Sequence, residues 1–382
     1  MVEHGWAGEI RGDNSDDARL VPAVDTLKGS RSNNFDVLRF VLAVAVFAAH
    51  SYPLVEGDAA REPLMRLTRG QIHMGEISVD GFFILSGFLV TQSWFRSAGV
   101  RNYLGKRLLR IVPGYVVAIL FCVFLIGPLG SQNIGEYWSG FNLSFFLRGL
   151  INLYPPGPPA IPPVFLALPY PKALNGSMWT IRPEFICYLV VAALGLVRLL
   201  DRKAVIAIAL VGLLAVLGRG DYQGLTVPIL GPLDEWPRLA ACFLVGIAFF
   251  AFRDRIPRSW ALVALCTAVV VVAARVPGSL RWVLPVPLGY LLFALAFSRA
   301  VNLSGFARRG DFSYGIYLYA WPVQQLLVQS FGPQLAPEGL TAAAFLPTLL
   351  LAVLSWHFVE RPFLALKSSA RRPAEAAVSA NR

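Results

Sequence analysis

Two residues that could take part in proton transfer occur in the first apolar segment of the sequence. Arg39 and His50 lie eleven positions apart in an otherwise apolar stretch. An α-helix turns by roughly 100° per residue, so both side chains are expected on one helix face, separated by roughly 16 Å along the axis. Histidine is the side chain best suited to accept a hydroxyl proton near neutral pH. We therefore predict His50 as a general base, and its alternative is a hydrogen-bonded core residue.

A group of cations precedes the third apolar segment. Lys106, Arg107 and Arg110 come just before Pro113. The i, i+3 spacing places both arginines on one side of a helix, and guanidinium groups pair well with phosphate oxygens. Together with Arg39 they predict a site for a phosphate-bearing molecule. The alternative is that these charges only orient the chain in a membrane.

Two acidic residues are expected at the outer ends of their helices. They should lie at about the same depth in the membrane as His50. Asp80 lies near the start of the second apolar segment, and Glu184 follows Trp179 and Arg182 at the start of the fourth. Asp80 either orients His50 or lies in the membrane interface. Glu184 needs a partner, for which Arg182 and His50 are the candidates. Charged groups at membrane depth are rare and indicate function.

The last two apolar segments carry a further polar set. Ser313, Tyr314 and Tyr317 begin the ninth, and Glu360 ends the tenth. Glu360 is expected at about the depth of Arg39. An ion pair between these two side chains is a structural prediction.

The elements that must position these residues are membrane-spanning helices. Hydrophobic residues make up 56% of the 382-residue chain and charged residues 15%, against about 25% charged residues in soluble domains. A helix of about 20 apolar residues crosses the bilayer core. The predicted fold class is all-α and polytopic, with ten spans at about 35–54, 78–95, 111–130, 179–199, 203–219, 237–253, 258–275, 282–298, 312–331 and 343–364.

The distribution of Lys and Arg predicts the orientation. Basic residues gather in alternate connections, and positive loops face the cytoplasm. Both termini are therefore expected there, as a disordered extension (1–34) and a tail (367–382), flanking a membrane domain at 35–366. The connection 131–178 then faces outward, and its proline-rich part excludes a regular helix. We interpret it either as a plain connector or as a lid or wall over an acceptor site.

Charge and cysteine content exclude other classes. The net charge of +11 is explained by membrane orientation, and no basic segment has the aromatic interleaving typical of nucleic-acid binding. The four cysteines lie inside apolar segments without metal-type spacing. No metal site or disulfide framework is predicted.

Six segments, taken in order, resemble acyltransferase family 3, membrane acyltransferases that modify bacterial surface glycans and some secondary metabolites. The resemblance covers about residues 33–366. The matching residues are Arg39 and His50, the stretch Phe82 to Phe88, Arg107 with Arg110 and Pro113, Trp179 with Thr180, Ile181 and Glu184, Ser313 with Tyr314, Tyr317 and Leu318, and Glu360 with Pro362. One position departs from the pattern, because many members have a histidine where this chain has Ala320.

The resemblance implies a multi-pass enzyme of the cell inner (plasma) membrane that transfers an acyl group, commonly acetyl, from cytoplasmic acyl-CoA. The acceptor implied is a hydroxyl of an extracytoplasmic or lipid-linked carbohydrate. In this interpretation Lys106, Arg107, Arg110 and Arg39 hold the nucleotide end of CoA. His50 acts as general base in a direct transfer, and Glu184 or Asp80 supports the imidazole or the sugar. A covalent acyl-histidine is the variant mechanism.

A transporter of a lipid-linked sugar or polysaccharide is the alternative function. Buried charges also mark transport paths. The paired Arg39 and His50 and the inner arginines are not needed by a simple exporter, and CoA binding would distinguish the two functions.

Overall fold

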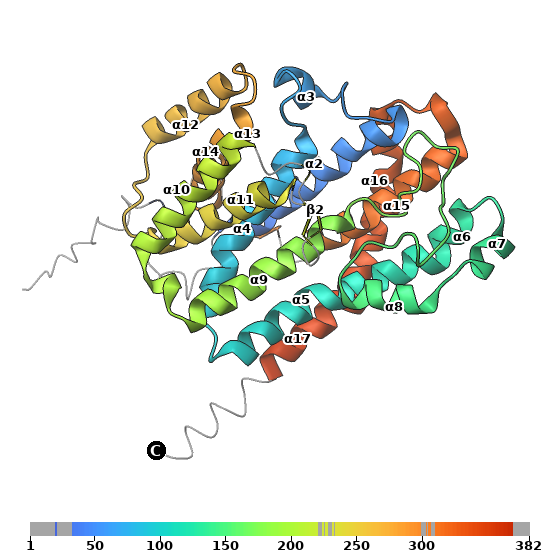
Figure 1. Ribbon diagram of the computed structural model, residues 1–382, viewed down its shortest axis with the longest axis horizontal. Helices are drawn as coiled ribbons and strands as arrows, with labels where there is room; N and C mark the ends of the chain where they lie inside the picture. The colour runs from blue at the N-terminus through green and yellow to red at the C-terminus, as the bar shows by residue number, and fades with distance from the viewer. Residues whose placement is uncertain are drawn as a thin grey trace, which may run out of the picture.

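The described part of the chain is almost entirely helical (Figure 1). The computed structural model describes residues 33–220, 234–298 and 310–369, together with 20, 224, 226–227, 231–232, 303 and 305–306. Two short strands, β1 (Thr226–Val227) and β2 (Gly231–Pro232), pair antiparallel. The predicted disordered extension 1–34 lies outside the described ranges except for residues 20, 33 and 34. The predicted tail 367–382 lies outside them except for 367–369, the last residues of α17 (Arg361–Ser369).

The helices follow one another with mostly short connections. In chain order they are α2 (Phe35–Glu56), α3 (Pro63–Leu67), α4 (Met74–Phe95), α5 (Val100–Phe121), η1 (Cys122–Ile126), α6 (Gly127–Gly130), α7 (Ile134–Ser139), α8 (Leu143–Ile151), η2 (Met178–Thr180), α9 (Ile181–Leu196), η3 (Leu199–Asp201), α10 (Lys203–Arg219), α11 (Trp236–Ala251), α12 (Trp260–Ala273), α13 (Leu280–Val283), α14 (Pro285–Ala296), α15 (Ser313–Phe331), η5 (Gly332–Gln334), α16 (Pro337–Ser355), η6 (Trp356–Glu360) and α17 (Arg361–Ser369).

The helix positions agree with a membrane protein. A helix lies within each of the ten predicted ranges. Among the described residues, 5 helices are long and apolar enough to cross a membrane: Phe35–Glu56, Met74–Phe95, Val100–Gly130, Met178–Leu196 and Pro337–Leu366. The helical character is thus confirmed, and the length and composition of these helices are consistent with a membrane protein. The count of ten spans and the cytoplasmic placement of both termini stay predictions, and "predicted inner" and "predicted outer" below refer to that orientation.

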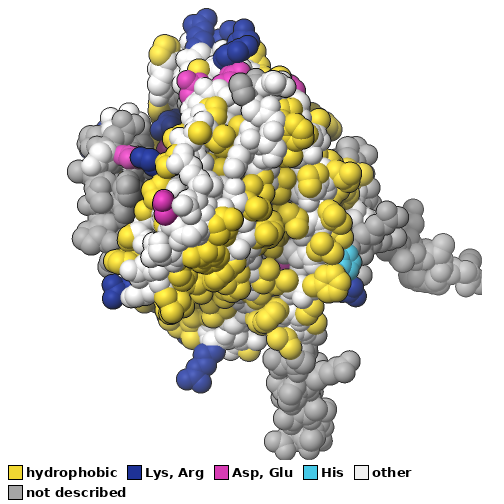
Figure 2. Space-filling model, turned by 90° about the vertical axis from the view of Figure 1, so that its right-hand side faces the viewer, with side chains coloured by type: hydrophobic (Ala, Val, Ile, Leu, Met, Phe, Trp, Pro, Cys, Tyr) yellow, Lys and Arg dark blue, Asp and Glu magenta, His cyan; other side chains and the backbone are white. Residues whose placement is uncertain are grey.

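The surface also has the character of a membrane protein. Figure 2 shows hydrophobic side chains over most of the middle of one side, with Lys and Arg mainly toward its edges. On α16 and η6, Leu346 and Phe358 are 73% and 76% exposed, and on α8 Ile151 is 80% exposed. Apolar surface on this scale is unusual on a soluble monomer, and it suits contact with lipid.

The connection 131–178 divides into two parts. Its first part forms α7 and α8, on the opposite side of the molecule from α12 and α13 (Figure 1). The part from 152 to 177 contains no helix, as its prolines predict. Segment 172–178 runs inward from the surface, and Leu174 and Met178 are fully buried.

Helix α4 is held firmly against α11. A Cβ atom on Gly87 would lie 2.0 Å from the Phe243 carbonyl oxygen, and one on Gly246 would lie 2.1 Å from the Ile84 carbonyl oxygen. Only glycine permits such a close approach of two helix backbones. At the start of α4, the His73 imidazole accepts hydrogen bonds from the backbone N–H groups of Gly75 and Glu76. The glycine contact and this cap fix the position of α4.

Helix α15 lies beside α16 and also packs on α2 (Figure 1). A Cβ on Gly315 would lie 2.7 Å from the Cα of Ala352, so α15 and α16 are in close contact. The Tyr314 hydroxyl donates to the Ile111 carbonyl at 2.9 Å, which joins α15 to α5. Helices α2, α4, α5, α9 and α15 therefore surround a common interior region.

Candidate active site

A cluster of charged side chains joins α2, α5 and the start of α15 at their predicted inner ends. Arg39 Nη1 and Arg110 Nη2 lie 3.3 and 2.5 Å from Oδ2 of Asp311. The Ser313 hydroxyl donates to the other Asp311 oxygen at 2.5 Å. Burial alone would raise the pKa of Asp311, but Arg110 and Arg39 hold that pKa well below its usual range. The charged carboxylate therefore keeps two guanidinium groups side by side.

The predicted ion pair between Arg39 and Glu360 is wrong. Glu360 Oε2 lies 4.0 Å from Arg110 Nη1, and Glu360 Oε1 accepts a hydrogen bond from Ser355. Arg39 instead pairs with Asp36 and Asp311. The reason is that Asp311 provides a nearer carboxylate for Arg39, which leaves Glu360 beside Arg110.

A cavity begins at this cluster and extends between the five helices. It contains about 920 Å³ of space not filled by atoms, including the part open to solvent. Along α4 its wall runs from Val79 to Val90, a length of roughly 16 Å at about 1.5 Å per residue. Its lining comprises Arg39, Val79, Phe82, Phe83, Leu85, Ser86, Leu89, Val90, Arg107, Arg110, Ile111, Thr180, Ile181, Glu184, Tyr188, Ser313, Tyr314 and Tyr317. We call it the central cavity.

A smaller polar cavity adjoins it at the predicted inner side. Arg39 and Leu89 line both cavities. The smaller one also has Asn33, Gln92 and Arg96 in its wall. A molecule with a polar head and a narrow, less polar arm could therefore place its head near Arg39 and its arm along α4.

Arg107 contributes a buried donor that the protein leaves unused. Its Nη2 donates to the Ser93 hydroxyl at 3.2 Å, and its guanidinium lies over the Tyr188 ring at 5.7 Å from the centroid. Its buried Nε has no hydrogen-bond partner. No acidic side chain pairs with Arg107 within the described ranges. A half-buried guanidinium with an unpaired buried N–H is suited to bind an anionic ligand from the cavity that it lines.

Glu184 lies in the wall of the central cavity, but neither predicted partner contacts it. Its Oε1 accepts hydrogen bonds from Tyr188 at 2.5 Å and from Ser86 at 3.1 Å. The Arg182 guanidinium instead lies 4.2 Å from the centroid of the Tyr154 ring. The carboxylate is thus held by two hydroxyl groups and faces the cavity that the arginines enter.

His50 lies outside the lining of the central cavity. Its ring meets the Trp321 ring edge-on, with centroids 4.9 Å apart. Its Nδ1 is buried and has no hydrogen-bond partner in the protein. The Trp321 indole N–H donates to the Ala173 carbonyl at 3.1 Å, which fixes the indole beside the imidazole. An unpaired imidazole nitrogen is available to accept a proton.

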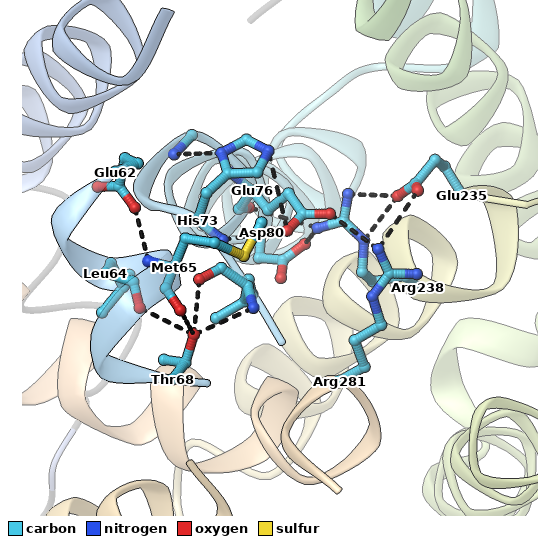
Figure 3. A network of polar contacts seen from close by, with 12 residues as sticks. Glu62, Leu64, Met65, Thr68, His73, Glu76, Asp80, Glu235, Arg238 and Arg281 are labelled. Atoms are coloured by element: carbon cyan, nitrogen blue, oxygen red, sulfur yellow. Dashed lines mark hydrogen bonds and ion pairs between the residues drawn. The ribbon is translucent and has the colours of Figure 1, made fainter. Parts of the chain in front are cut away.

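Asp80 is part of a different cluster, drawn in Figure 3. It forms a buried ion pair with Arg238, and each side chain is 2% exposed. Arg238 also pairs with Glu235, and Arg281 pairs with Glu76 at 2.9 Å. The prediction that Asp80 orients His50 receives no support, because Arg238 of α11 takes up the carboxylate.

The structure thus gathers some predicted residues and separates others. Seven surround the central cavity: Arg39, Arg107, Arg110, Glu184, Ser313, Tyr314 and Tyr317. Lys106, Trp179 and Glu360 do not line it. Lys106 donates to Ser97 at 3.0 Å, and Trp179 is 38% exposed. The Tyr317 hydroxyl bonds to Thr180 at 2.5 Å and to the Ser177 carbonyl, so it ties α15 to the start of α9.

Sequence analysis missed four residues that matter here. Asp311 bridges two arginines, Trp321 contacts His50, and Ser86 and Tyr188 hold Glu184. Asp311 stands two positions before Ser313, and Ser86 lies inside the stretch from Phe82 to Phe88. Ser86 was therefore within a segment that the sequence analysis considered, whereas Asp311 lay just outside one. Nothing local to the sequence indicates the contacts of Trp321 or Tyr188.

The chain is similar to known acyltransferases. A family model described as an acyltransferase domain matches residues 32–357. An O-acetyl transferase of Shigella phage Sf6 is 28% identical over 345 residues, 88% of this chain and 98% of the phage protein. Nodulation protein 10 of Rhizobium leguminosarum bv. viciae is 27% identical over 372 residues, 91% of this chain and 97% of that protein. Acyltransferase MdmB of Streptomyces mycarofaciens is 26% identical over 156 residues, 40% of this chain and 36% of that protein. No solved structure gives a significant match.

Proposed function

Since this chain belongs to acyltransferase family 3 and is an O-acyltransferase, we propose that it takes an acetyl group from cytoplasmic acetyl-CoA. The acceptor in this proposal is a hydroxyl group of an extracytoplasmic or lipid-linked carbohydrate. His50 is the general base, and the enzyme acts in the inner (plasma) membrane. The observation that carries the proposal is the central cavity, which has three arginines at one end and leads along α4 in the direction of His50.

The arginines fit the charge of the donor. Arg39 and Arg110 are held together by Asp311, and Arg107 keeps a buried Nε without a partner. Arginine binds phosphate oxygens through paired N–H groups, and such charge-assisted hydrogen bonds are the strong ones. In this proposal the phosphates of CoA contact these arginines and the polar cavity beside them. The pantetheine arm then extends along the α4 wall, where the lining between Phe82 and Leu89 is largely apolar.

His50 is suited to the chemical step by its free nitrogen. In the proposed transfer, Nδ1 accepts the proton of the acceptor hydroxyl while its oxygen bonds to the thioester carbonyl carbon. The carbon–sulfur bond then breaks, and the CoA thiolate takes the proton from the imidazolium. Trp321 packs edge-on against the imidazole and limits its rotation. The direct transfer needs no covalent acyl-enzyme.

Arg39 and His50 share one face of α2. Aromatic side chains lie between them along the axis of this helix. Phe82 packs against the Tyr317 ring at 6.2 Å between centroids, and both line the central cavity. Phe82 also packs in the apolar cluster that contains Ala43 and Phe47 of α2. The thioester must pass this pair to reach His50. Their ring contact therefore marks the point where the donor arm meets the acceptor side.

The test is CoA release by the purified protein in nanodiscs supplied with radiolabelled acetyl-CoA, with water as the acyl acceptor. We expect His50→Ala to lose about 100- to 10,000-fold of the rate, the usual contribution of a general base. His357→Ala is the matched control, since His357 is exposed and its ring bonds to the Val353 carbonyl. Full activity in folded His50→Ala protein would remove His50 from the mechanism. Failure of the wild type to bind CoA would favour the transporter of a lipid-linked sugar.

A further inference from the structure

A second large cavity lies in the connection 131–178, at the predicted outer side. It contains about 1190 Å³ of space not filled by atoms, including the part open to solvent. Its lining comprises Phe145, Arg148, Gly149, Asn152, Tyr154, Pro155, Pro156, Gly157, Pro158, Pro159, Ala160, Lys172, Ala173, Leu174, Asn175 and Gly176. We call it the outer cavity. It shares no lining residue with the central cavity.

The outer cavity is cationic. Arg148 and Lys172 line it, and none of its lining residues is acidic. Glu136 is the single acidic residue in the sequence from 131 to 178, and it bonds to Asn133 on α7. Neither Arg148 nor Lys172 forms an ion pair in the part of the chain that the structure describes. Two cations without counter-ions at the edge of one cavity are suited to an anionic ligand.

The wall of the outer cavity contains aromatic side chains and a rigid proline-rich backbone. The Tyr154 ring lines the cavity and is 43% exposed, and the Phe145 ring lies below the Arg148 guanidinium at 5.7 Å. Arg182 supports the Tyr154 ring from α9. Aromatic rings present apolar faces on which a sugar ring can stack. The prolines at 155–159 fix backbone angles, so the wall loses little conformational freedom when a ligand binds.

The outer cavity lies next to the reaction centre. The segment from Lys172 to Gly176 forms its inner wall, and Thr180 and Ile181, a few residues later, line the central cavity. Trp321 packs against this same segment. A Cβ on Gly176 would lie 2.6 Å from Cζ2 of the indole. The indole also meets the His50 ring, with centroids 4.9 Å apart, and the Tyr170 ring, with centroids 5.2 Å apart. One indole ring and one strip of backbone therefore separate the outer cavity from His50.

We propose that the outer cavity is the acceptor subsite for an acidic saccharide. A carboxylate or phosphate on one sugar unit pairs with Arg148 and Lys172, while a hydroxyl on a neighbouring unit of the same saccharide reaches His50. The wall at Trp321 and Gly176 keeps the anionic unit itself away from the imidazole. This inference rests on the proposed function for the identity of the reaction. The binding of the acidic unit can nevertheless be measured without any transfer.

The experiment measures binding to the full chain in nanodiscs of uncharged phosphatidylcholine. The probes are tetragalacturonate, which carries carboxylates, and maltotetraose, a neutral oligosaccharide of the same length. We expect the wild type to bind the acidic probe at least about tenfold more tightly than the neutral one. The preference should be lost in Arg148→Ala/Lys172→Ala, since this variant lacks both cations that pair with the carboxylates. Arg275→Ala is the matched control, because Arg275 is exposed beyond α12, on the opposite side of the molecule.

Two results would overturn the acceptor subsite. One is equal affinity of the wild type for the acidic and neutral probes, which includes binding of neither. The other is an unchanged preference in the double variant. Hydrolysis of acetyl-CoA, in which water replaces the saccharide hydroxyl as acyl acceptor and CoA is released, serves as the separate readout. The double variant is expected to match the wild type there, whereas His50→Ala loses that activity, so failure of the subsite and failure of the proposed function give different results.

Discussion

Two clusters of charged side chains in the described part of the chain differ in how completely their cations are paired with acidic side chains. In the cluster around Arg238, the ions pair with one another: Arg238 with Asp80 and Glu235, and Arg281 with Glu76. In the cluster around Asp311, Arg39 and Arg110 share that carboxylate, and Asp36 and Glu360 lie beside them. Arg107 nearby has no acidic partner among the described residues. Only the second cluster lines the central cavity.

The difference shows that a buried charge is not enough to mark a functional site. Asp80 and Arg39 both lie in predicted membrane-spanning helices, and both were candidates on that ground. Asp80 is neutralised by a partner on α11 and helps hold α4 in place. Arg39 faces a cavity that Arg107 also lines, and Arg107 has no acidic partner among the described residues. Incomplete pairing beside an open volume is the better indicator of a ligand.

The largest effect is expected from breaking the cluster around Arg238, in which the ions pair with one another. Arg238→Ala leaves Asp80 buried without a partner, which costs about 3–5 kcal/mol. We expect a much lower thermal unfolding temperature in detergent and a poor yield of folded protein. The double variant Asp80→Leu/Arg238→Leu is expected to recover most of this loss, since it removes both charges. If Arg238→Ala unfolded at the wild-type temperature, the structural role of this cluster would be wrong.

The next largest effect is expected from Arg107, beside the cluster around Asp311, and it is an effect on enzyme activity. Arg107→Ala should raise the KM for acetyl-CoA about ten- to a hundredfold, the loss of one charge-assisted contact to phosphate. The unfolding temperature should stay close to that of the wild type, because Arg107 has no acidic partner to leave behind. Arg101→Ala is the control, as Arg101 is exposed on the same helix outside the cavity. An Arg107→Ala protein that unfolded at a lower temperature but kept a normal KM would show that Arg107, like Arg238, serves stability and not donor binding.

A smaller effect is expected from the pH dependence of Asp311. Its pKa in the folded protein lies below the usual range, so its contribution to stability is present above the unfolded value of about 3.9. That contribution is lost only as pH falls from there toward the lower folded pKa. The difference in unfolding temperature between wild type and Asp311→Asn should therefore be constant from about pH 8 to 5 and shrink below about pH 4. A difference that vanished between pH 7 and 6 would contradict the ion cluster.

Local sequence patterns predicted much of the fold. Apolar runs located the helices, and prolines excluded a helix from 152 to 177. The spacing of Arg107 and Arg110 correctly placed both on one side of α5, where they line one cavity. Each of these predictions depends only on residues close together in the chain, because hydrophobic periodicity and the backbone restriction of proline are local effects.

The partners of the charged residues could not be predicted in the same way. Arg238 is 158 positions from Asp80, and Asp311 is 272 positions from Arg39. Which helices meet is decided by close contacts such as that of Gly87 with Phe243, and no periodic pattern encodes them. The same limit applies to Trp321, whose contact with His50 joins α15 to α2. The central cavity and the outer cavity both result from this packing of helices that are distant in the sequence.

The central claim is that donor binding and proton transfer are carried out at separate places, the arginines of the central cavity and His50. The most direct test measures acetyl-CoA affinity and CoA release on the same His50→Ala preparation in nanodiscs. We expect His50→Ala to keep the wild-type affinity with release reduced by about 100-fold or more, and Arg107→Ala to show weakened affinity. If His50→Ala lost acetyl-CoA binding, or kept both binding and release, the division between the two places would be contradicted.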